Sequence, residues 1–539
     1  MDRYEPKTDL LSIIKAMSPL ETLPWDQYFA EMAEADYLLG KANELAVKSY
    51  FIRKAPFGGS YALAGGITAM IRQIHDMRFN TGLFRDSMLA LGHSQGFVDY
   101  LAETKRFQTR IFAPQEGGMF FPNEPIITIE GPLAHVRLIE GIITKEVNFP
   151  SLSMTKWHRL VRVASPGRVL EFARRRAQDA LRTTLYAMCA GCFASSNANM
   201  KIYADINIVG TMGHEWIQAF GDVLEAFMAW LSVKPDKPVG LVDTIQCLEY
   251  DFPLWLQAVL AHQKKIREAN PTMWGWRNDS GDLAHQAMVQ FQKFMRHALA
   301  QDPWFLEKFA IVQTNEIDEW AAYEIINQIR DTVPELAQEI IGHIIWAAGT
   351  KPGVCSDQPS IGGVAKLMEA SNQACIKLNF DANRLPGAKT SIPGCNFSAL
   401  IVDPCDNEAK FVLIFPAADY SINPDGQLVD KGGGEVLQKL TGHHPDNPGD
   451  QIEMSPYIAI SSQNLVYDSL DGNGFTPNWK NPEIGEVTRQ IQRQVNMLPW
   501  TMTRLVKPET MRVYLTPKLY TLRRRMIEQG VLRADKLQL

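Results

Sequence analysis

The side chains best suited to chemistry in this chain lie in one run of six residues, 277–282. The run reads Arg-Asn-Asp-Ser-Gly-Asp. The carboxylates at 279 and 282 can hold a vicinal diol or a metal ion, and Arg277 can bind a phosphate oxygen. Gly281 lets a ligand approach the backbone. These groups suit a phosphorylated sugar, although the run before Leu283 is also typical of a helix N-cap.

Polar or glycine-rich segments also follow several other apolar runs. They are Arg174-Arg175-Arg176, the Gly-Thr-Met-Gly-His segment at 210–214, Asp243-Thr244, and Gly349-Thr350. If the preceding runs are parallel strands, their carboxyl ends meet on one face, where the active site of an α/β barrel forms. The sequence therefore predicts one site that collects arginines, carboxylates, glycines and a histidine.

Two of these features have a structural and a functional interpretation. A histidine such as His214 is structural as often as it is catalytic, and its flanking glycines favour the site. Gly362-Gly363 precedes residues 364–370, where we expect a helix. A helix start presents free N–H groups to an anion such as phosphate, and Gly349 could provide a second such loop. A plain turn is the alternative at Gly362-Gly363.

The elements that must position these residues alternate between strand-like and helix-like segments. Expected strands are 168–172, 204–208, 239–242, 273–277, 309–313 and 341–347. This βα repetition predicts a parallel sheet, most simply an irregular TIM-like α/β barrel, with an open doubly wound sheet as the alternative.

The sequence pattern along the whole chain predicts three domains. Residues 1–150 form an N-terminal α+β domain, helical to about residue 50, with further helices over 67–107 and short strands over 109–131. Residues 151–395 form the barrel. Residues 396–539 contain two strands within 396–416 and a basic C-terminal helix, and complete the N-terminal domain.

The composition of the chain limits the classes of partner and the compartment that we expect. The 539 residues are 46% hydrophobic and 21% charged, with a net charge of −6. An acidic chain is unsuited to nucleic acid or anionic membranes, so local basic groups must capture anionic substrates. No signal peptide or membrane-spanning run is evident. Seven scattered cysteines are typical of a reducing compartment, so we expect a cytoplasmic protein.

The assembled motifs resemble those of nicotinate phosphoribosyltransferases, which are type II phosphoribosyltransferases. The matching segments are the Arg-Lys-Ala-Pro-Phe-Gly-Gly run at 53–59, 171–178, 210–216, 277–282 and 357–364. They occur in the same order, and the match extends more weakly to the C-terminus.

The resemblance implies a reaction of nicotinate with 5-phosphoribosyl 1-pyrophosphate, with Mg²⁺ and coupled ATP hydrolysis. It implies a homodimer whose active sites are shared between subunits. By similarity, His214 is transiently phosphorylated and acts with Arg175 and Asp279. The implied base-binding residues are Phe172, Arg175, Ser196 and Asn197. The implied phosphoribosyl pyrophosphate-binding residues are Arg277, Asp279, Ser280, Gly281, Gly349, Thr350, Gly362 and Gly363.

The identity of the base depends on a few positions. Related nicotinamide-using enzymes have an aspartate where Asn197 stands, and a neutral amide tolerates a carboxylate ligand. The segment Gly40-Lys41-Ala42-Asn43 replaces the family's Thr-Asp-x-Tyr, and residues 178–181 and Ala194 also depart from the pattern. The alternatives are the same fold acting on nicotinamide or another aromatic base, and a catalytically weak homologue with a binding role.

Overall fold

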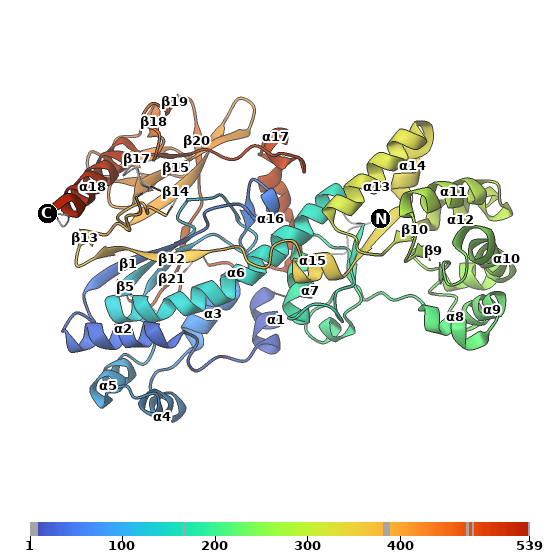
Figure 1. Cartoon of the computed structure of the whole chain (residues 1–539), viewed down its shortest axis with the longest axis horizontal. Helices are drawn as coiled ribbons and strands as arrows, with labels where there is room; N and C mark the ends of the chain where they lie inside the picture. Colours follow the sequence, from blue (N-terminus) through green and yellow to red (C-terminus); the bar gives the residue numbers. More distant parts are fainter. Residues whose placement is uncertain are drawn as a thin grey trace. The chain divides into compact units, whose positions relative to one another are not determined.

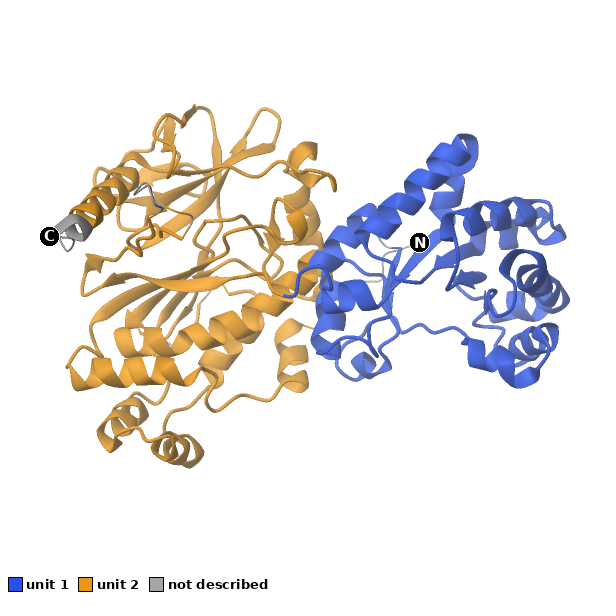
Figure 2. Ribbon diagram, viewed as in Figure 1, with its two compact units in different colours: residues 1–7, 156–359 blue, residues 8–155, 360–539 orange. Residues whose placement is uncertain are grey.

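The computed structural model describes residues 9–164, 168–380, 387, 389–470, 474–476 and 479–536. The chain divides into two compact units (Figure 2). Unit 1 contains the segment Lys156–Pro359, and unit 2 combines Thr8–Thr155 with Ser360–Leu539. The predicted division into three domains, at 1–150, 151–395 and 396–539, differs from this division into two units and stays a prediction.

Unit 1 is built on a parallel sheet of six strands. Its order is β7 (Ala194–Ser195), β6 (Val169–Glu171), β11 (Ile344–Ala348), β10 (Phe309–Gln313), β9 (Trp274–Asn278) and β8 (Val239–Leu241). Every neighbouring pair is parallel. The predicted α/β class with a parallel sheet is therefore confirmed.

The sheet curls around a shared core. One buried cluster contains Ala194 and Val239, which come from the two edge strands, β7 and β8. The last strand of the unit, β11, pairs with the first, β6, as in a barrel. In the described part of the chain, however, β8 pairs only with β9. A closed barrel stays a prediction.

Helices follow the strands of unit 1 in the βα order expected (Figure 1). They are α7 (Ala180–Cys189), α8 (His214–Phe220), α9 (Val223–Val233), α10 (Phe252–Ala269), α11 (Leu283–Met295), α12 (Pro303–Lys308), α13 (Glu319–Thr332), α14 (Pro334–His343) and α15 (Thr350–Val354). Gly275 shows how closely the strands lie, because a Cβ there would stand 1.9 Å from the carbonyl oxygen of Ala310. Only glycine fits between the buried Trp274 and Trp276.

Two of the predicted strands in unit 1, at 204–208 and 341–347, differ in part from the structure. Residues 204–208 form a loop in which only Ile208 makes a bridge, to Ser195. The alternating apolar pattern is real, since Ala204 and Ile206 are buried, but β7 has only two residues with which a neighbour can pair. Residues 341–343 end helix α14, and strand β11 begins at Ile344.

Unit 2 combines helices with two larger sheets. Its helices are α1 (Leu10–Met17), α2 (Gln27–Leu38), α3 (Ile67–Asp76), α4 (Gly82–Ala90), α5 (Gln95–Thr104), α16 (Ile484–Asn496), α17 (Trp500–Thr503) and α18 (Pro517–Lys536), and α6 (Leu133–Val163) contains the boundary between the units. Figure 1 labels these elements.

The first sheet of unit 2 has the order β13 (Gln373–Ala374), β12 (Val364–Ala370), β1 (Leu45–Phe51), β5 (Ile127–Pro132), β3 (Arg110–Ala113), β21 (Asn464–Asp468) and β22 (Gly474–Phe475). The second has the order β19 (Gln451–Met454), β18 (Leu440–His443), β23 (Val513–Leu515), β15 (Glu408–Pro416), β14 (Asn396–Asp403) and β20 (Ile458–Ser461). Smaller pairs are β2 (Ala62–Leu63) with β4 (Met119–Phe120), and β16 (Tyr420–Ile422) with β17 (Leu428–Asp430). The predicted strands within 396–416 are confirmed as β14 and β15.

Two helical predictions in unit 2 are wrong. Residues 45–51 form strand β1 rather than continuing the N-terminal helices. Residues 364–370 form strand β12, which pairs antiparallel with β1. The residues of β12, Val-Ala-Lys-Leu-Met-Glu-Ala, favour a helix intrinsically, and pairing with a buried strand overrides that preference.

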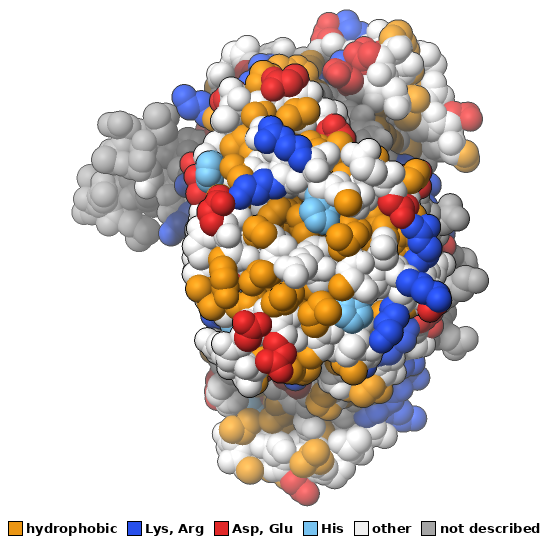
Figure 3. All heavy atoms as spheres, turned by 90° about the vertical axis from the view of Figure 1, so that its right-hand side faces the viewer, with side chains coloured by type: hydrophobic (Ala, Val, Ile, Leu, Met, Phe, Trp, Pro, Cys, Tyr) orange, Lys and Arg blue, Asp and Glu red, His pale blue; other side chains and the backbone are white. Residues whose placement is uncertain are grey.

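Among the described residues, no helix is both long and apolar enough to cross a bilayer. On the face shown in Figure 3, acidic, basic and hydrophobic side chains are mixed. This mixture agrees with capture of anionic ligands by local groups rather than by a broad basic surface.

Candidate active site

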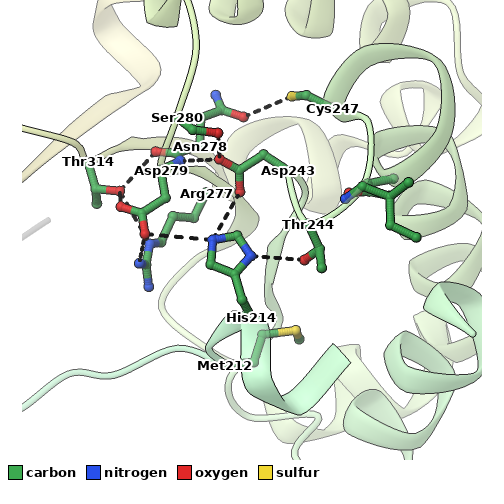
Figure 4. Close-up of polar contacts among 12 residues, drawn as sticks. Met212, His214, Asp243, Thr244, Cys247, Arg277, Asn278, Asp279, Ser280 and Thr314 are labelled. Atoms are coloured by element: carbon green, nitrogen blue, oxygen red, sulfur yellow. Dashed lines mark hydrogen bonds and ion pairs between the residues drawn. The ribbon is translucent and has the colours of Figure 1, made fainter. Parts of the chain in front are cut away.

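The polar segments that follow β8, β9 and β10 meet at one edge of the sheet in unit 1 (Figure 4). These strands are adjacent and parallel, so their carboxyl ends lie together. Asp243 follows β8, Asp279 follows β9 and Thr314 follows β10, while His214 begins α8. The sequence-based prediction that these loops form one cluster is confirmed for this part of unit 1.

Arg277 and Asp279 form the centre of the cluster. The Arg277 Nη2 lies 2.8 Å from Asp279 Oδ2, and its Nη1 donates to Thr211 Oγ1 at 2.9 Å. The single proton of the Thr314 hydroxyl is within hydrogen-bond reach of Asp279 Oδ1 and of the backbone oxygen of Asn278, which lies 2.9 Å from Oγ1. The guanidinium and the carboxylate are thus fixed by two threonines, while 29% of the Asp279 side chain stays exposed to a ligand.

Asp243 holds the loop after β9 in place. Its Oδ2 accepts the backbone N–H of Asp279 at 2.8 Å and the Ser280 hydroxyl at 2.7 Å. Only 3% of its side chain is exposed, and its Oδ1 is buried without a hydrogen-bond partner in the described residues. A buried carboxylate oxygen without a donor is costly, and the imidazole Nε2 of His214 lies 3.8 Å from this atom.

His214 faces both carboxylates. Its Nδ1 lies 3.0 Å from Thr244 Oγ1, and its Nε2 lies 3.8 Å from both Asp243 Oδ1 and Asp279 Oδ2. The imidazole is 37% exposed, so a ligand can reach it. The His214 side chain is therefore part of the cluster, and its role in catalysis stays a prediction.

The run 277–282 serves two purposes at once. Asp282 caps α11 by accepting the N–H of His285 at 3.0 Å, and Gly281 has a positive φ of 79°. Asp282 therefore belongs to the helix start, whereas Arg277, Asp279 and Ser280 belong to the cluster. The helix-cap interpretation is confirmed for Asp282, and binding of a phosphorylated sugar by the other residues of the run stays a prediction.

A second layer of amides supports the strand end. Asn278 and Gln290 exchange hydrogen bonds of 2.8 and 2.9 Å through their side-chain amides. The Trp276 Nε1 donates to Gln290 Oε1 at 2.8 Å, and the Cys247 thiol lies within hydrogen-bond distance of both amides. Burial raises the pKa of Cys247 to about 12, so the thiol stays protonated beside these amides.

The residues expected to bind the base lie after β6 and β7. Phe172 is half-buried and packs against the sheet core, and Arg175 is exposed on the following turn. Ser196 is half-buried, whereas Asn197 is fully buried and donates from Nδ2 to Thr184 Oγ1 at 3.0 Å. Their contacts with a base stay a prediction.

A buried carboxylate organises this second region. Glu171 accepts the Thr184 hydroxyl at 2.9 Å, and it also accepts the Ser195 hydroxyl and the backbone N–H of Ala173. Burial raises the pKa of Glu171. The Glu171 carboxyl therefore ties β6 to α7 and β7, and so supports the turn that carries Phe172.

The glycines expected to bind phosphate are divided between the units. Gly349 precedes α15, which begins at Thr350 in unit 1. Gly362 and Gly363 lie in unit 2, where they precede a strand. The argument from a helix dipole is therefore wrong for Gly362 and Gly363. A Cβ on Gly363 would lie 2.0 Å from the Tyr50 hydroxyl, so packing alone requires this glycine. Phosphate binding at these positions rests on the resemblance.

Sequence reasoning placed Asp243 and Thr211 in site segments without giving either a role, and it did not find Thr314. Asp243 was located by its position, since it is the first polar residue after the apolar strand β8. Thr314 likewise follows β10 directly. A single threonine carries no motif, so its role emerges only once the strand order places it beside Asp279.

Comparison with known proteins connects the chain to one family along most of its length. A family model described as the nicotinate phosphoribosyltransferase N-terminal domain matches residues 23–148. A human protein named nicotinate phosphoribosyltransferase is 30% identical over 432 residues, covering 70% of this chain and 77% of that protein. A Dictyostelium discoideum protein of the same name is 28% identical over 96% of this chain and 89% of its own length.

Solved structures show the same fold. The crystal structure of human nicotinic acid phosphoribosyltransferase superimposes with a TM-score of 0.72 at 23% identity, covering 93% of this chain and 99% of the other. A Pyrococcus furiosus nicotinate-nucleotide pyrophosphorylase has a TM-score of 0.55 at 14% identity, over 92% and 99% of the two chains. At these identities the structural likeness establishes the fold and leaves the chemistry to the residues.

Proposed function

We propose that this chain, which belongs to the nicotinate phosphoribosyltransferase family, joins nicotinate to 5-phosphoribosyl 1-pyrophosphate and forms nicotinate mononucleotide and pyrophosphate. The observation that supports the proposal best is the cluster of Arg277, Asp279, Asp243 and His214 on adjacent strand ends. The relatives are named nicotinate phosphoribosyltransferase, which indicates the reaction. The arginine, the two aspartates and the histidine of the cluster are side chains that suit this reaction.

Asp279 binds the ribose of the substrate in this proposal. A carboxylate accepts hydrogen bonds from two neighbouring hydroxyls, and Thr314 and Arg277 fix its orientation. Because Arg277 lies beside the carboxylate, its positive charge also attracts the phosphate groups of the same substrate. Preorganised groups of this kind need little rearrangement during the reaction.

The bond changes need no general base. The pyridine nitrogen of nicotinate has a free lone pair, which forms the new bond to the sugar C1. The C1–O bond breaks, and its electron pair leaves with pyrophosphate. The protein must therefore stabilise a departing polyanion and a cationic sugar. Arg175, exposed after β6, contributes to the first of these tasks, and Asp279 contributes to the second.

The donor set fits Mg²⁺. Carboxylate oxygens are its preferred protein ligands, and Asp243 Oδ1 is a buried oxygen without a hydrogen-bond donor among the described residues. Asp243 and Asp279 would hold the ion, either directly or through water. When bound, Mg²⁺ neutralises part of the charge of pyrophosphate.

His214 is proposed as the residue that ATP phosphorylates. A neutral imidazole nitrogen is a phosphoryl acceptor, and Thr244 orients the ring by its contact with Nδ1. Because the transfer chemistry needs no base, His214 is free for this role.

The proposal includes a homodimer in the cytoplasm. Leu38 and Leu39 are 68% and 71% exposed, next to the segment 40–43 that replaces the family's Thr-Asp-x-Tyr. Adjacent exposed leucines favour burial in an interface. All seven cysteines are free thiols, which suits a reducing compartment.

Product analysis tests the proposal. The purified full chain is incubated with 5-phosphoribosyl 1-pyrophosphate and either nicotinate or nicotinamide, with and without ATP, and pyrophosphate release is measured. We expect release with nicotinate, stimulation by ATP and loss upon chelation of Mg²⁺. A preference for nicotinamide would support the alternative base, and inactivity with every pyridine base would refute the proposal.

A further inference from the structure

A group of possible metal ligands lies in unit 2, away from the residues of the proposed active site. Glu31 and Glu34 are on helix α2, and His93 lies two residues before helix α5, which packs against α2 (Figure 1). Each of the three side chains places a ring nitrogen or a carboxylate oxygen within 4.8 Å of the other two. The imidazole distinguishes this group from a set of surface carboxylates, because imidazole nitrogen suits zinc, copper and nickel.

The tautomer of His93 follows from its partners. Only 1% of its side chain is exposed, and its Nδ1 lies 2.6 Å from Glu34 Oε2. Its Nε2 lies 3.1 Å from the Nε2 of Gln27, an amide nitrogen that can only donate. The His93 Nε2 therefore accepts, and the ring proton is on Nδ1, which donates it to Glu34. A neutral imidazole with a lone pair on Nε2 is the form that binds a metal ion.

Glu34 holds the imidazole in this orientation. Its Oε2 accepts from His93 Nδ1, and its Oε1 accepts the backbone N–H of Ser94 at 2.7 Å. Both carboxylate oxygens of Glu34 are thus directed at the segment that carries the histidine. In metal sites, a carboxylate that accepts the far N–H of a ligating histidine fixes the ring and raises its basicity. Glu34 has this position, so it orients the His93 ring rather than binding the metal.

Two acceptors converge on the amide group of Gln27. The Gln27 Nε2 donates to Glu31 Oε1 at 2.8 Å, and the same nitrogen faces His93 Nε2. Gln27 and Glu31 are about one helical turn apart, so their side chains share one face of α2. A carboxylate and an imidazole lone pair therefore point at one place. A divalent cation there satisfies both acceptors, and rotation of the Gln27 amide adds its carbonyl oxygen as a third ligand.

We propose that His93 Nε2, the Glu31 carboxylate and the Gln27 carbonyl bind a zinc ion or a similar divalent transition metal. Gln27 and Glu31 are exposed, so the ion enters from solvent and water completes its coordination. The bound metal joins α2 to the segment before α5, which is a structural role. The site is built from unit 2 alone and does not depend on the proposed phosphoribosyl transfer.

Calorimetric titration of the metal-free full-length chain with Zn²⁺, in excess Mg²⁺, tests the proposal. Glu31→Gln retains the shape of an exposed side chain but removes the charged ligand. We expect binding at least about tenfold weaker, since loss of an outer partner alone weakens metal sites by that factor. Glu103→Gln is the matched control, because Glu103 is an exposed glutamate on α5 outside the group. It should bind Zn²⁺ as the unmodified chain does, and equal affinity in Glu31→Gln would overturn the proposal.

Cobalt(II) tests the orientation of the ring, because it binds N/O sites much as zinc does and is paramagnetic. With His93 Nε2 on the metal, the proton on Nδ1 should give one strongly shifted, exchangeable ¹H NMR signal. Glu34→Gln removes the charged acceptor of this proton and should weaken binding about 10- to 100-fold. Absence of the signal from the cobalt-loaded chain, or unchanged affinity in Glu34→Gln, would refute the assignment.

Two comparisons separate this site from the proposed active site. His214→Gln should retain the Zn²⁺ affinity and the cobalt signal, and loss of both in His214→Gln with retention in Glu31→Gln would overturn the proposal. Raising Mg²⁺ about tenfold should change the Zn²⁺ affinity less than about twofold, because Mg²⁺ prefers oxygen ligands and imidazole suits zinc. A proportional loss of Zn²⁺ affinity would exclude His93 as a ligand.

Discussion

Replacing Asp279 by asparagine should separate catalysis from stability. The substitution preserves shape and leaves one oxygen that can accept the Thr314 hydroxyl, but it removes the charge that faces Arg277. Because 29% of the Asp279 side chain is exposed, solvent screens the ion pair. We expect the free energy of unfolding to fall by no more than about 1 kcal/mol.

The effect on turnover should be far larger. An ionised acceptor binds a hydroxyl about 1–2 kcal/mol more strongly than a neutral one, and the proposal assigns two ribose hydroxyls to Asp279. The transition state should lose roughly 2–4 kcal/mol, or about 30- to 1000-fold in kcat/KM for 5-phosphoribosyl 1-pyrophosphate. Pyrophosphate release measures turnover, and chemical denaturation measures stability.

The same loop provides a matched control. Asp282→Asn also removes one carboxylate, yet asparagine caps a helix as well as aspartate does, so α11 should keep its N-cap and turnover should change less than about twofold. Asp279→Asn with kcat/KM within about fivefold of the original would refute the ribose assignment. An equal loss in both variants would indicate a general effect of charge.

Three further predictions address other parts of the account. Thr244→Val removes the hydroxyl beside His214 Nδ1 and should lower ATP-stimulated turnover about fivefold, while Thr244→Ser should restore it; identical rates for both would contradict the role of the contact. Burial raises the pKa of Glu124 from 4.5 to about 7, so the folded state binds this proton more tightly than the unfolded chain and the free energy of unfolding should fall as the pH rises through 7. Denaturation at pH 4.5 and pH 8 should show that Glu124→Gln removes about 3 kcal/mol of this dependence, and an unchanged pH profile would exclude the assignment. Finally, Leu38→Glu with Leu39→Glu should convert a dimer to monomers in light scattering, whereas an intact dimer would place the interface elsewhere.

The placement of polar residues at the strand ends was predictable because it depends on local order. An apolar strand followed at once by polar residues places those residues at the edge of a parallel sheet, and this rule located the run 277–282 and Asp243. His214 was placed by an expected strand at 204–208 that is a loop in the structure. The rule needs only the sequence periodicity and the shared direction of the strands. It worked even where the strand bounds were off by a residue or two, as at β9.

Features that depend on tertiary pairing were not predictable in the same way. Strand β12 has the intrinsic preferences of a helix, and its partner β1 lies more than 300 residues earlier in the chain. The roles of Thr211 and Thr314 depend on which strands are neighbours. Gln27 and His93 are 66 residues apart in the chain, so no local pattern indicates the site that they share.

The most direct test of the account is identification of the product by mass spectrometry. The purified chain is supplied with nicotinate, 5-phosphoribosyl 1-pyrophosphate, Mg²⁺ and ATP, and Asp279→Asn is treated in parallel. The account predicts nicotinate mononucleotide and an equal amount of pyrophosphate from the unmodified chain, with little of either from the variant. Absence of the mononucleotide from a folded chain, or equal yields from both proteins, would contradict it.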